Sequence, residues 1–227
     1  MRFSSYHFFP LTLPFLLILF LLFFLLIGVI EIGILHYAYE KIGIDRRYIF
    51  LLLLLSLLGS SINIPVAELP AKRVLSGQEV SFFGIRYVIP VVREWPRTVI
   101  AVNVGGAVIP TLLSLYLLLQ RGIYGRALLG TAIVALIVYW LSYPIRGVGI
   151  AVPTFIPPLV AAGVSLLLSP RAAPPLAYIV GSLGTLIGAD LCNLNRIQGL
   201  GAPIVSIGGA GTFDGIFLTG ILAVLLA

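Results

Sequence analysis

The sequence predicts an all-α polytopic membrane protein with six or seven transmembrane helices, a glycine- and proline-broken segment near the C-terminus, and a small extended or β-hairpin surface cap. Of its 227 residues, 60% are apolar and only 10% are charged, whereas a soluble domain is typically less than half apolar and about a quarter charged. The mean hydropathy of +1.14 agrees. At about 20 apolar residues per span, the length leaves room for six or seven crossings and their loops.

The first apolar run, Leu11–Ile30, is interpreted as a retained span. A signal peptide has a shorter apolar core and a small-residue cleavage site, and this run is longer and continues without such a site. Further spans are expected at Tyr48–Ile64, Thr98–Leu119, Ala127–Tyr143, Ile150–Leu168, Pro174–Leu194 and Thr212–Ala227. Residues 1–227 are treated as a single transmembrane domain.

A polar surface cap is expected at residues 66–96, between spans two and three, because this stretch holds more charged residues than any other. Within it, Glu79–Pro90 is rich in β-branched and aromatic residues and has a central glycine, a pattern that favours a hairpin or an extended segment. A segment this short cannot bury a core of its own. We therefore expect it to lie on the membrane surface.

Two segments interrupt the helical pattern. Pro153 and Pro157 break the start of the fifth span, and Gly199–Gly211 is apolar but broken by glycine and proline. Non-helical backbone at membrane depth is tolerated only when it is buried in protein or lines a wet cavity. The second segment is therefore expected to be a re-entrant loop or a broken helix.

The charged and metal-binding residues exclude several classes of protein. The net charge is +6, but the basic residues lie singly between apolar runs, as interface anchors do, so no nucleic-acid partner is expected. The single cysteine, Cys192, excludes an intramolecular disulfide, and its apolar setting suggests a packing residue. Two histidines, His7 and His36, are too few for a histidine-based metal cluster. We expect no metal and no cofactor.

Only two acidic residues, Asp190 and Asp214, lie deep within the C-terminal apolar region. Ionisable residues inside a membrane are costly, so each marks a candidate functional site. Each lies beside a pair of glycines whose spacing allows helices to approach closely, namely Gly184/Gly188 and Gly211/Gly215. A turn between them would bring both carboxylates to a similar depth, where they could share a proton as paired acids do.

The motifs in Gly181–Asp190 and Gly208–Gly220 resemble those of a prokaryotic integral membrane family known as domain of unknown function sixteen-fourteen. The resemblance extends over Ser60–Pro65, Asn103–Pro110 and Val152–Pro158 to the C-terminus, and so covers most of the chain. It implies an integral membrane protein but no activity.

A weaker similarity is to presenilin-type and prepilin-type intramembrane aspartyl proteases. Those enzymes pair an Asp in one helix with a Gly-x-Gly-Asp at the start of the next. Here Asp214 follows Gly209-Ala-Gly211 after two extra residues, Thr212 and Phe213. The similarity implies that Asp190 and Asp214 are the catalytic pair.

Three functions are compatible with these residues. The preferred one is an intramembrane aspartyl-protease-like hydrolase, in which one Asp is general base for water and the other, protonated, polarises the peptide carbonyl. The alternative is a proton- or ion-coupled small-solute transporter that uses the same pair, with the fifth span as gate. The third is a non-catalytic membrane assembly factor, in which Asn193, Asn195 and Arg196 simply satisfy Asp190, and Asp214 caps a helix.

These functions also predict which residues contact a substrate or act as a gate, which partners the protein has and where it is located. Five residues are candidates for substrate contact or gating: Arg146, Pro153, Pro157, Gly209 and Gly211. The expected partners are the lipid bilayer and either a membrane peptide or a small solute. The expected location is the plasma membrane of a prokaryote.

Overall fold

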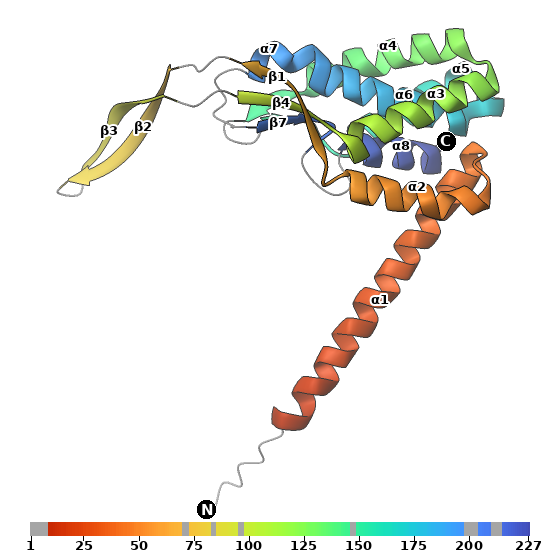
Figure 1. Ribbon diagram of the computed structural model, residues 1–227, viewed down its shortest axis with the longest axis horizontal. Coiled ribbons are helices and arrows are strands. Elements are labelled where there is room, and N and C mark those ends of the chain that lie inside the picture. Colours follow the sequence, from red (N-terminus) through yellow and green to blue (C-terminus); the bar gives the residue numbers. More distant parts are fainter. Residues whose placement is uncertain are drawn as a thin grey trace, which may run out of the picture.

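The computed structural model describes residues 9–69, 73–82, 85–94, 98–145, 149–197, 204–209 and 215–227. Apart from most of α1, the helices lie in one bundle, and the strands lie at one end of it (Figure 1). The longer helices are α1 (Phe9–Ile42), α2 (Arg46–Gly59), α3 (Ile109–Arg121), α4 (Tyr124–Leu141), α5 (Ile156–Leu168), α6 (Ala173–Thr185) and α8 (Gly215–Leu226). The short helical segments are η1 (Val104–Val108), η2 (Pro170–Ala172), η3 (Leu186–Asp190), η4 (Leu191–Asn193) and α7 (Leu194–Ile197).

Helix α6 is the centre of the bundle. It contacts α1, α3, α4, α5 and α8, and most of its residues are buried. Glycines permit this close packing, because a Cβ at Gly184 would meet the Val134 side chain and one at Gly188 would meet the Ala135 carbonyl oxygen of α4. The sequence prediction that Gly184 and Gly188 mark a close helix approach is therefore confirmed.

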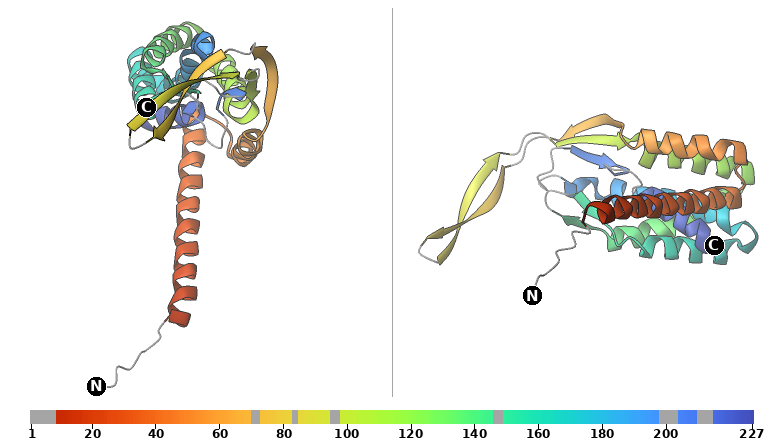
Figure 2. Two further views of the ribbon diagram at one scale, coloured as in Figure 1. Left: turned by 90° about the vertical axis from the view of Figure 1, so that its left-hand side faces the viewer. Right: turned by 90° about the horizontal axis from the view of Figure 1, so that it is seen from below.

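Among the residues that the structure describes, three helical stretches are long and apolar enough to cross a membrane by length and composition: Val104–Arg121, Tyr124–Leu141 and Pro170–Ile197. Helices α5 and α8 are apolar but shorter. Helix α1 spans 34 residues and contains the predicted run Leu11–Ile30. Figure 2 shows α1 leaving the bundle, with only its C-terminal end packed against it, where Tyr39 and Ile42 are buried. The chain is an integral membrane protein by these criteria, and a count of six or seven spans stays a prediction.

A three-stranded sheet at one end of the bundle corrects the all-α prediction. Strand β4 (Thr98–Asn103) pairs antiparallel with β1 (Asn63–Leu69) and parallel with β7 (Ile204–Ile207). Strand β4 runs directly into η1 and α3 with no charged residue between them, so hydropathy alone joined them into one predicted span, Thr98–Leu119. Likewise, the glycine-broken segment contains strand β7 where a re-entrant loop or broken helix was expected.

The two remaining strand pairs are hairpins at the same end of the molecule. Strands β2 (Arg73–Phe82) and β3 (Ile85–Glu94) pair antiparallel from Arg73↔Glu94 to Phe82↔Ile85, which confirms a hairpin in the predicted cap and lengthens it beyond Glu79–Pro90. This hairpin projects from the end of the bundle (Figure 1). Strands β5 (Tyr143–Ile145) and β6 (Gly149–Ala151) form the second, shorter pair between α4 and α5.

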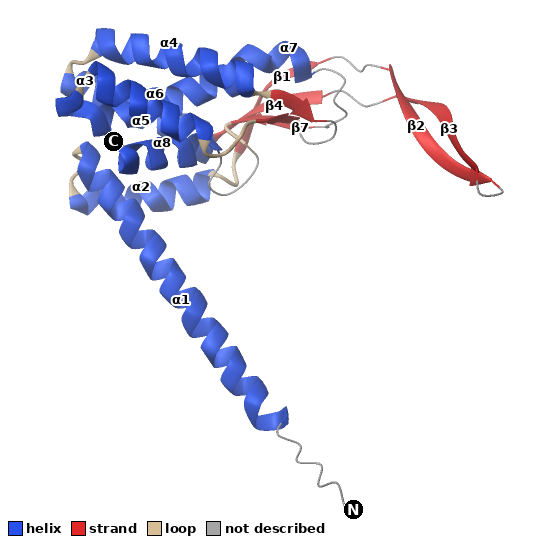
Figure 3. Ribbon diagram, turned by 180° about the vertical axis from the view of Figure 1, so that it is seen from behind, coloured by secondary structure: helices blue, strands red, loops and turns tan. Residues whose placement is uncertain are grey.

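The opposite end of the bundle is basic. Three cations there tie chain segments together: Lys41 Nζ donates to the Val224 carbonyl oxygen at 3.1 Å, Arg121 donates to that of Ile42 at 3.1 Å, and Arg126 donates to Ser169 Oγ at 3.0 Å. The end of α1 and the starts of α2, α4 and α6 therefore lie together with the ends of α3, α5 and α8 (Figure 3). Strands occupy one end of the molecule and basic loops the other.

Candidate functional site

The site begins where α6 changes its helical pitch. After Thr185 the helix continues as the π-helix η3, which ends at Asp190. A π-helical turn is closed by i→i+5 hydrogen bonds instead of the i→i+4 bonds of an α-helix, and it often occurs at functional sites. Thr185 and Asp190 are five residues apart, and both side chains line the same cavity, described below.

Asp190 is half-buried and holds the turn that follows strand β7. Its Oδ2 accepts a hydrogen bond of 2.8 Å from the backbone N–H of Gly208. Gly208 and the predicted site residue Gly209 have positive φ angles of 85° and 76°, a conformation that only glycine adopts without cost. The carboxylate thus connects η3 to the turn in which Gly209 lies.

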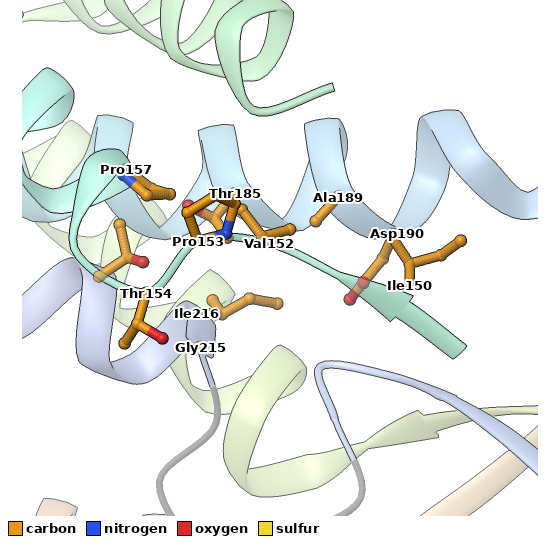
Figure 4. Close-up of a pocket in the computed structure, with 11 residues that line it drawn as sticks. Ile150, Val152, Pro153, Thr154, Pro157, Thr185, Ala189, Asp190, Gly215 and Ile216 are labelled. Atoms are coloured by element: carbon orange, nitrogen blue, oxygen red, sulfur yellow. The ribbon is translucent and has the colours of Figure 1, made fainter. Parts of the chain in front are cut away.

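A cavity of about 250 Å³ adjoins Asp190. It lies between η3, the end of α6, the start of α8 and the segment that joins β6 to α5 (Figure 4). Its lining residues are Ile150, Val152, Pro153, Thr154, Pro157, Thr185, Ala189, Asp190, Gly215, Ile216 and Thr219. The structure therefore brings together three predicted site residues that are distant in sequence, Asp190, Pro153 and Pro157.

Three threonines that sequence reasoning missed also line this cavity. They are Thr154, Thr185 and Thr219. The Thr185 side chain is only 4% exposed, and among the described residues its Oγ1 has no hydrogen-bond partner. Figure 4 shows Thr185, Ala189 and Asp190 along one helical ribbon, beside Val152 and Pro153. A five-residue spacing between Thr and Asp was the only sequence signal for this arrangement.

The family model described as "Protein of unknown function (DUF1614)" matches residues 57–226. The chain belongs to this family. The match runs from the end of α2 to the end of α8, so it contains Asp190 and the whole lining of the cavity and leaves out α1. No curated protein and no solved structure matches the chain.

Three predicted site residues of this DUF1614 protein, Asp214, Arg146 and Gly211, lie outside the residues that the structure describes. The prediction that Asp190 and Asp214 meet therefore stays a prediction. Gly215, which follows Asp214 in the chain, does line the cavity beside Asp190.

Neighbouring polar residues that were expected to satisfy Asp190 also make other bonds. The Asn193 amide donates to Ser142 Oγ and to the carbonyl oxygens of Gly188 and Ala189, at 2.9 to 3.0 Å. Arg196 donates to the Tyr139 hydroxyl at 2.9 Å, and its guanidinium lies 4.8 Å from the centre of that ring. These contacts join the end of α6 to the end of α4.

The remaining reactive groups are the potential metal ligands and the single cysteine. Within the described part of the chain, no three His, Cys, Asp or Glu side chains come close enough to hold a metal ion. Cys192 is exposed, so the expectation that it packs in the interior is wrong. It lies in η4, one of the short helical segments that follow α6 in the chain.

Proposed function

We propose that this DUF1614 protein is a proton- or cation-coupled transporter of a small solute, with Asp190 as the group that binds the coupling ion. The observation that carries the proposal is the cavity in which Asp190 lies with Thr154, Thr185 and Thr219. A carboxylate within an apolar bundle is costly unless it serves a ligand or a proton. Hydroxyl and carboxylate oxygens are ligands that cations prefer.

The backbone around the cavity supports the same function. One wall is the non-helical connection between β6 and α5, which contains Pro153, together with Pro157 in the first turn of α5, and another wall is the π-helical η3. Transporters commonly bind substrate and ions at such interrupted helices. A cavity of about 250 Å³ has room for several water molecules or a small ion, which favours this function over cleavage of a peptide.

The proposal is tested in proteoliposomes that enclose a pH-sensitive or a Na⁺-sensitive dye, under an imposed gradient of pH or of Na⁺. Wild type is expected to carry a proton or Na⁺ flux above that of empty liposomes, and Asp190→Asn is expected to abolish it. Asp45→Asn is the matched control, because Asp45 is exposed in the loop before α2. Flux in Asp190→Asn equal to that of wild type, or no flux in any protein, would overturn the proposal.

The aspartyl-protease-like hydrolase is the second candidate. One observation favours it: Gly215, the residue after Asp214, lines the cavity that contains Asp190. In this mechanism an unprotonated Asp takes a proton from water, and a protonated Asp donates a hydrogen bond to the peptide carbonyl. Cleavage of co-expressed membrane peptides is then lost in both Asp190→Asn and Asp214→Asn. Retained cleavage in either variant contradicts an aspartyl pair.

The orientation and location are part of the proposal. Short cytoplasmic loops carry an excess of Lys and Arg, and the loops at one end of the bundle contain Lys41, Arg46, Arg47, Arg121, Arg126 and Arg171. We therefore assign this end to the cytoplasm and the sheet end to the outside of a prokaryotic plasma membrane.

A further inference from the structure

A groove of about 680 Å³ runs between α2 and α3, well away from the Asp190 cavity. The two helices are antiparallel, since Arg121 at the end of α3 bonds Ile42 just before α2, while Gly59 at the end of α2 faces Gly105 just before α3. Figure 2 shows the two helices side by side. The groove is lined by Gly43, Ile44, Asp45, Tyr48, Leu51, Leu52, Leu55, Ile109, Leu112, Leu113, Tyr116 and Gln120.

The groove is amphipathic along its length. Leucine and isoleucine side chains line most of it, and polar and aromatic groups gather toward the end that contains Asp45, Tyr48, Tyr116 and Gln120. From Asp45 to Leu55 the helix rise alone gives the groove a length of about 15 Å. Tyrosines are typical of the level at which a membrane meets water. An apolar channel that ends at this level fits an acyl chain whose headgroup lies at the surface.

Cations surround the polar end. The Arg47 guanidinium lies 5.9 Å from the centre of the Tyr48 ring, and a Cβ at Gly43 would meet the Arg121 side chain. Both Tyr48 and Gly43 line the groove. Arg46 precedes Arg47 at the start of α2, where its Nε donates to His36 Nε2 of α1 at 3.1 Å and its side chain is 80% exposed.

The rim keeps a positive charge after its ion pairs are considered. Arg47 pairs with Asp45 at 3.1 Å and Arg46 lies 3.7 Å from Glu40. A hydrogen bond from the backbone N–H of Arg47 keeps the pKa of Asp45 below its ordinary value, so this acid is ionised at neutral pH. Arg121 instead donates to a neutral carbonyl oxygen. At the same end of the bundle, Lys41 also donates to a carbonyl oxygen, and Arg126 donates to a hydroxyl. These three cations are therefore not neutralised by the acceptors of these bonds.

We propose that this groove binds an anionic phospholipid, with one acyl chain between α2 and α3 and the phosphate at the rim formed by Arg47 and Arg121, next to the exposed Arg46. The apolar walls supply the site for the chain, and the uncompensated positive charge selects the headgroup. A zwitterionic lipid has the same chains but no net charge, so the rim distinguishes the two. This site does not depend on the function proposed for Asp190.

The test is native mass spectrometry of the full chain in neutral detergent, titrated with phosphatidylglycerol or with phosphatidylcholine of the same chains. Wild type is expected to retain one phosphatidylglycerol and to bind phosphatidylcholine at least tenfold more weakly. Each surface cation contributes about fivefold to the affinity for an anionic lipid. The double variant Arg46→Gln/Arg47→Gln is therefore expected to weaken phosphatidylglycerol binding by roughly 25-fold, and both residues are exposed enough for the fold to tolerate the change.

A second variant tests the groove itself. Leu112→Trp places a larger ring among the lining residues of α3 and is expected to abolish lipid retention. Leu167→Trp is its matched control, because Leu167 is an exposed leucine of α5 outside the groove. Equal binding of the two lipids, unchanged retention in Leu112→Trp, or a dimer that Leu112→Trp dissociates would overturn the proposal, the last because a second copy would then occupy the groove.

Discussion

Single residues determine how the sheet end of the molecule meets the bundle. Gly106 and Gly208 lie so close that a Cβ on Gly106 would overlap the Gly208 carbonyl oxygen. The Gly208 N–H in turn donates to Asp190. The carboxylate that we propose as the ion-binding group is therefore held in place by a turn that only glycine can form.

We predict that Gly208→Ala destabilises the protein by more than about 3 kcal/mol, because its φ of 85° is unfavourable for alanine and its Cβ would meet the backbone of Gly106 and Ala107. Gly122→Ala is the control. Gly122 also has a positive φ, of 63°, but a Cβ there has open space, so only the backbone cost of about 1–2 kcal/mol applies. Thermal unfolding in detergent measures both. Equal losses would show that the contact with Gly106 and Ala107 is unimportant.

We further predict that Thr185→Val separates stability from function. The Thr185 hydroxyl is buried without a hydrogen-bond partner among the described residues, so its replacement by an isosteric methyl is expected to leave the free energy of unfolding unchanged or to raise it by up to about 1 kcal/mol. Ion flux is expected to fall at least tenfold. Ser114→Ala is the control, because Ser114 Oγ is also buried and unpaired but lies in α3, outside the cavity. A normal flux in Thr185→Val contradicts a role for this hydroxyl.

At the scale of elements, sequence and structure agree best where the pattern is local. The hairpin β2–β3 follows from a segment rich in β-branched and aromatic residues with a central glycine, and the close approach of α6 to α4 follows from the spacing of Gly184 and Gly188. The three-stranded sheet was missed because β4 pairs with β7 across about 100 residues and with β1 across about 30 to 40, and pairing at such distances leaves no signal in a short window. The lining of the cavity was predicted only in part for a related reason, since the π-helical turn between Thr185 and Asp190 breaks the 3.6-residue period.

A buried asparagine explains why β4 ends where it does. The Asn103 side chain is fully buried, caps η1 by accepting from the Gly106 N–H at 2.7 Å, and donates to the Ser60 carbonyl oxygen at 2.7 Å and to Asn63 Oδ1 at 3.1 Å. Asn63 Oδ1 also accepts from the Ser206 hydroxyl of β7. The Asn103 and Asn63 side chains together therefore connect the end of α2, all three strands of the sheet and η1, which leads into α3.

We predict that Asn103→Ala destabilises the protein by about 3–5 kcal/mol, because it removes a helix cap and leaves buried backbone groups unpaired. Asn195→Ala, in exposed α7, is the control and is expected to change stability by less than about 0.5 kcal/mol. Hydrogen exchange is expected to show the loss first in β1, β4 and β7. A loss confined to α6 would contradict the role of Asn103 as the junction of the sheet.

In the whole molecule, the two ends of the helix bundle differ in charge and in secondary structure. The basic loops lie at one end and the strands, the Gly208 turn and the cavity lie toward the other (Figures 1 and 4). The proposed lipid site is at the basic end and the proposed ion site is toward the strand end. Composition predicted the membrane class, but this division arises from hydrogen bonds between segments far apart in the chain, which composition does not report.

Two cysteine variants make the assigned orientation testable. Both are made in a Cys192→Ser background, because Cys192 lies within the candidate span Pro170–Ile197. Val66→Cys places the only thiol in β1 at the sheet end, where Val66 is 56% exposed, and we predict that a membrane-impermeant maleimide labels it in intact cells. Arg46→Cys places the only thiol at the exposed start of α2 at the basic end, and it is expected to react only after the cells are permeabilised. The reverse pattern, with Arg46→Cys labelled from outside and Val66→Cys protected until permeabilisation, would show that the basic loops face outward and would contradict the orientation inferred from their charge.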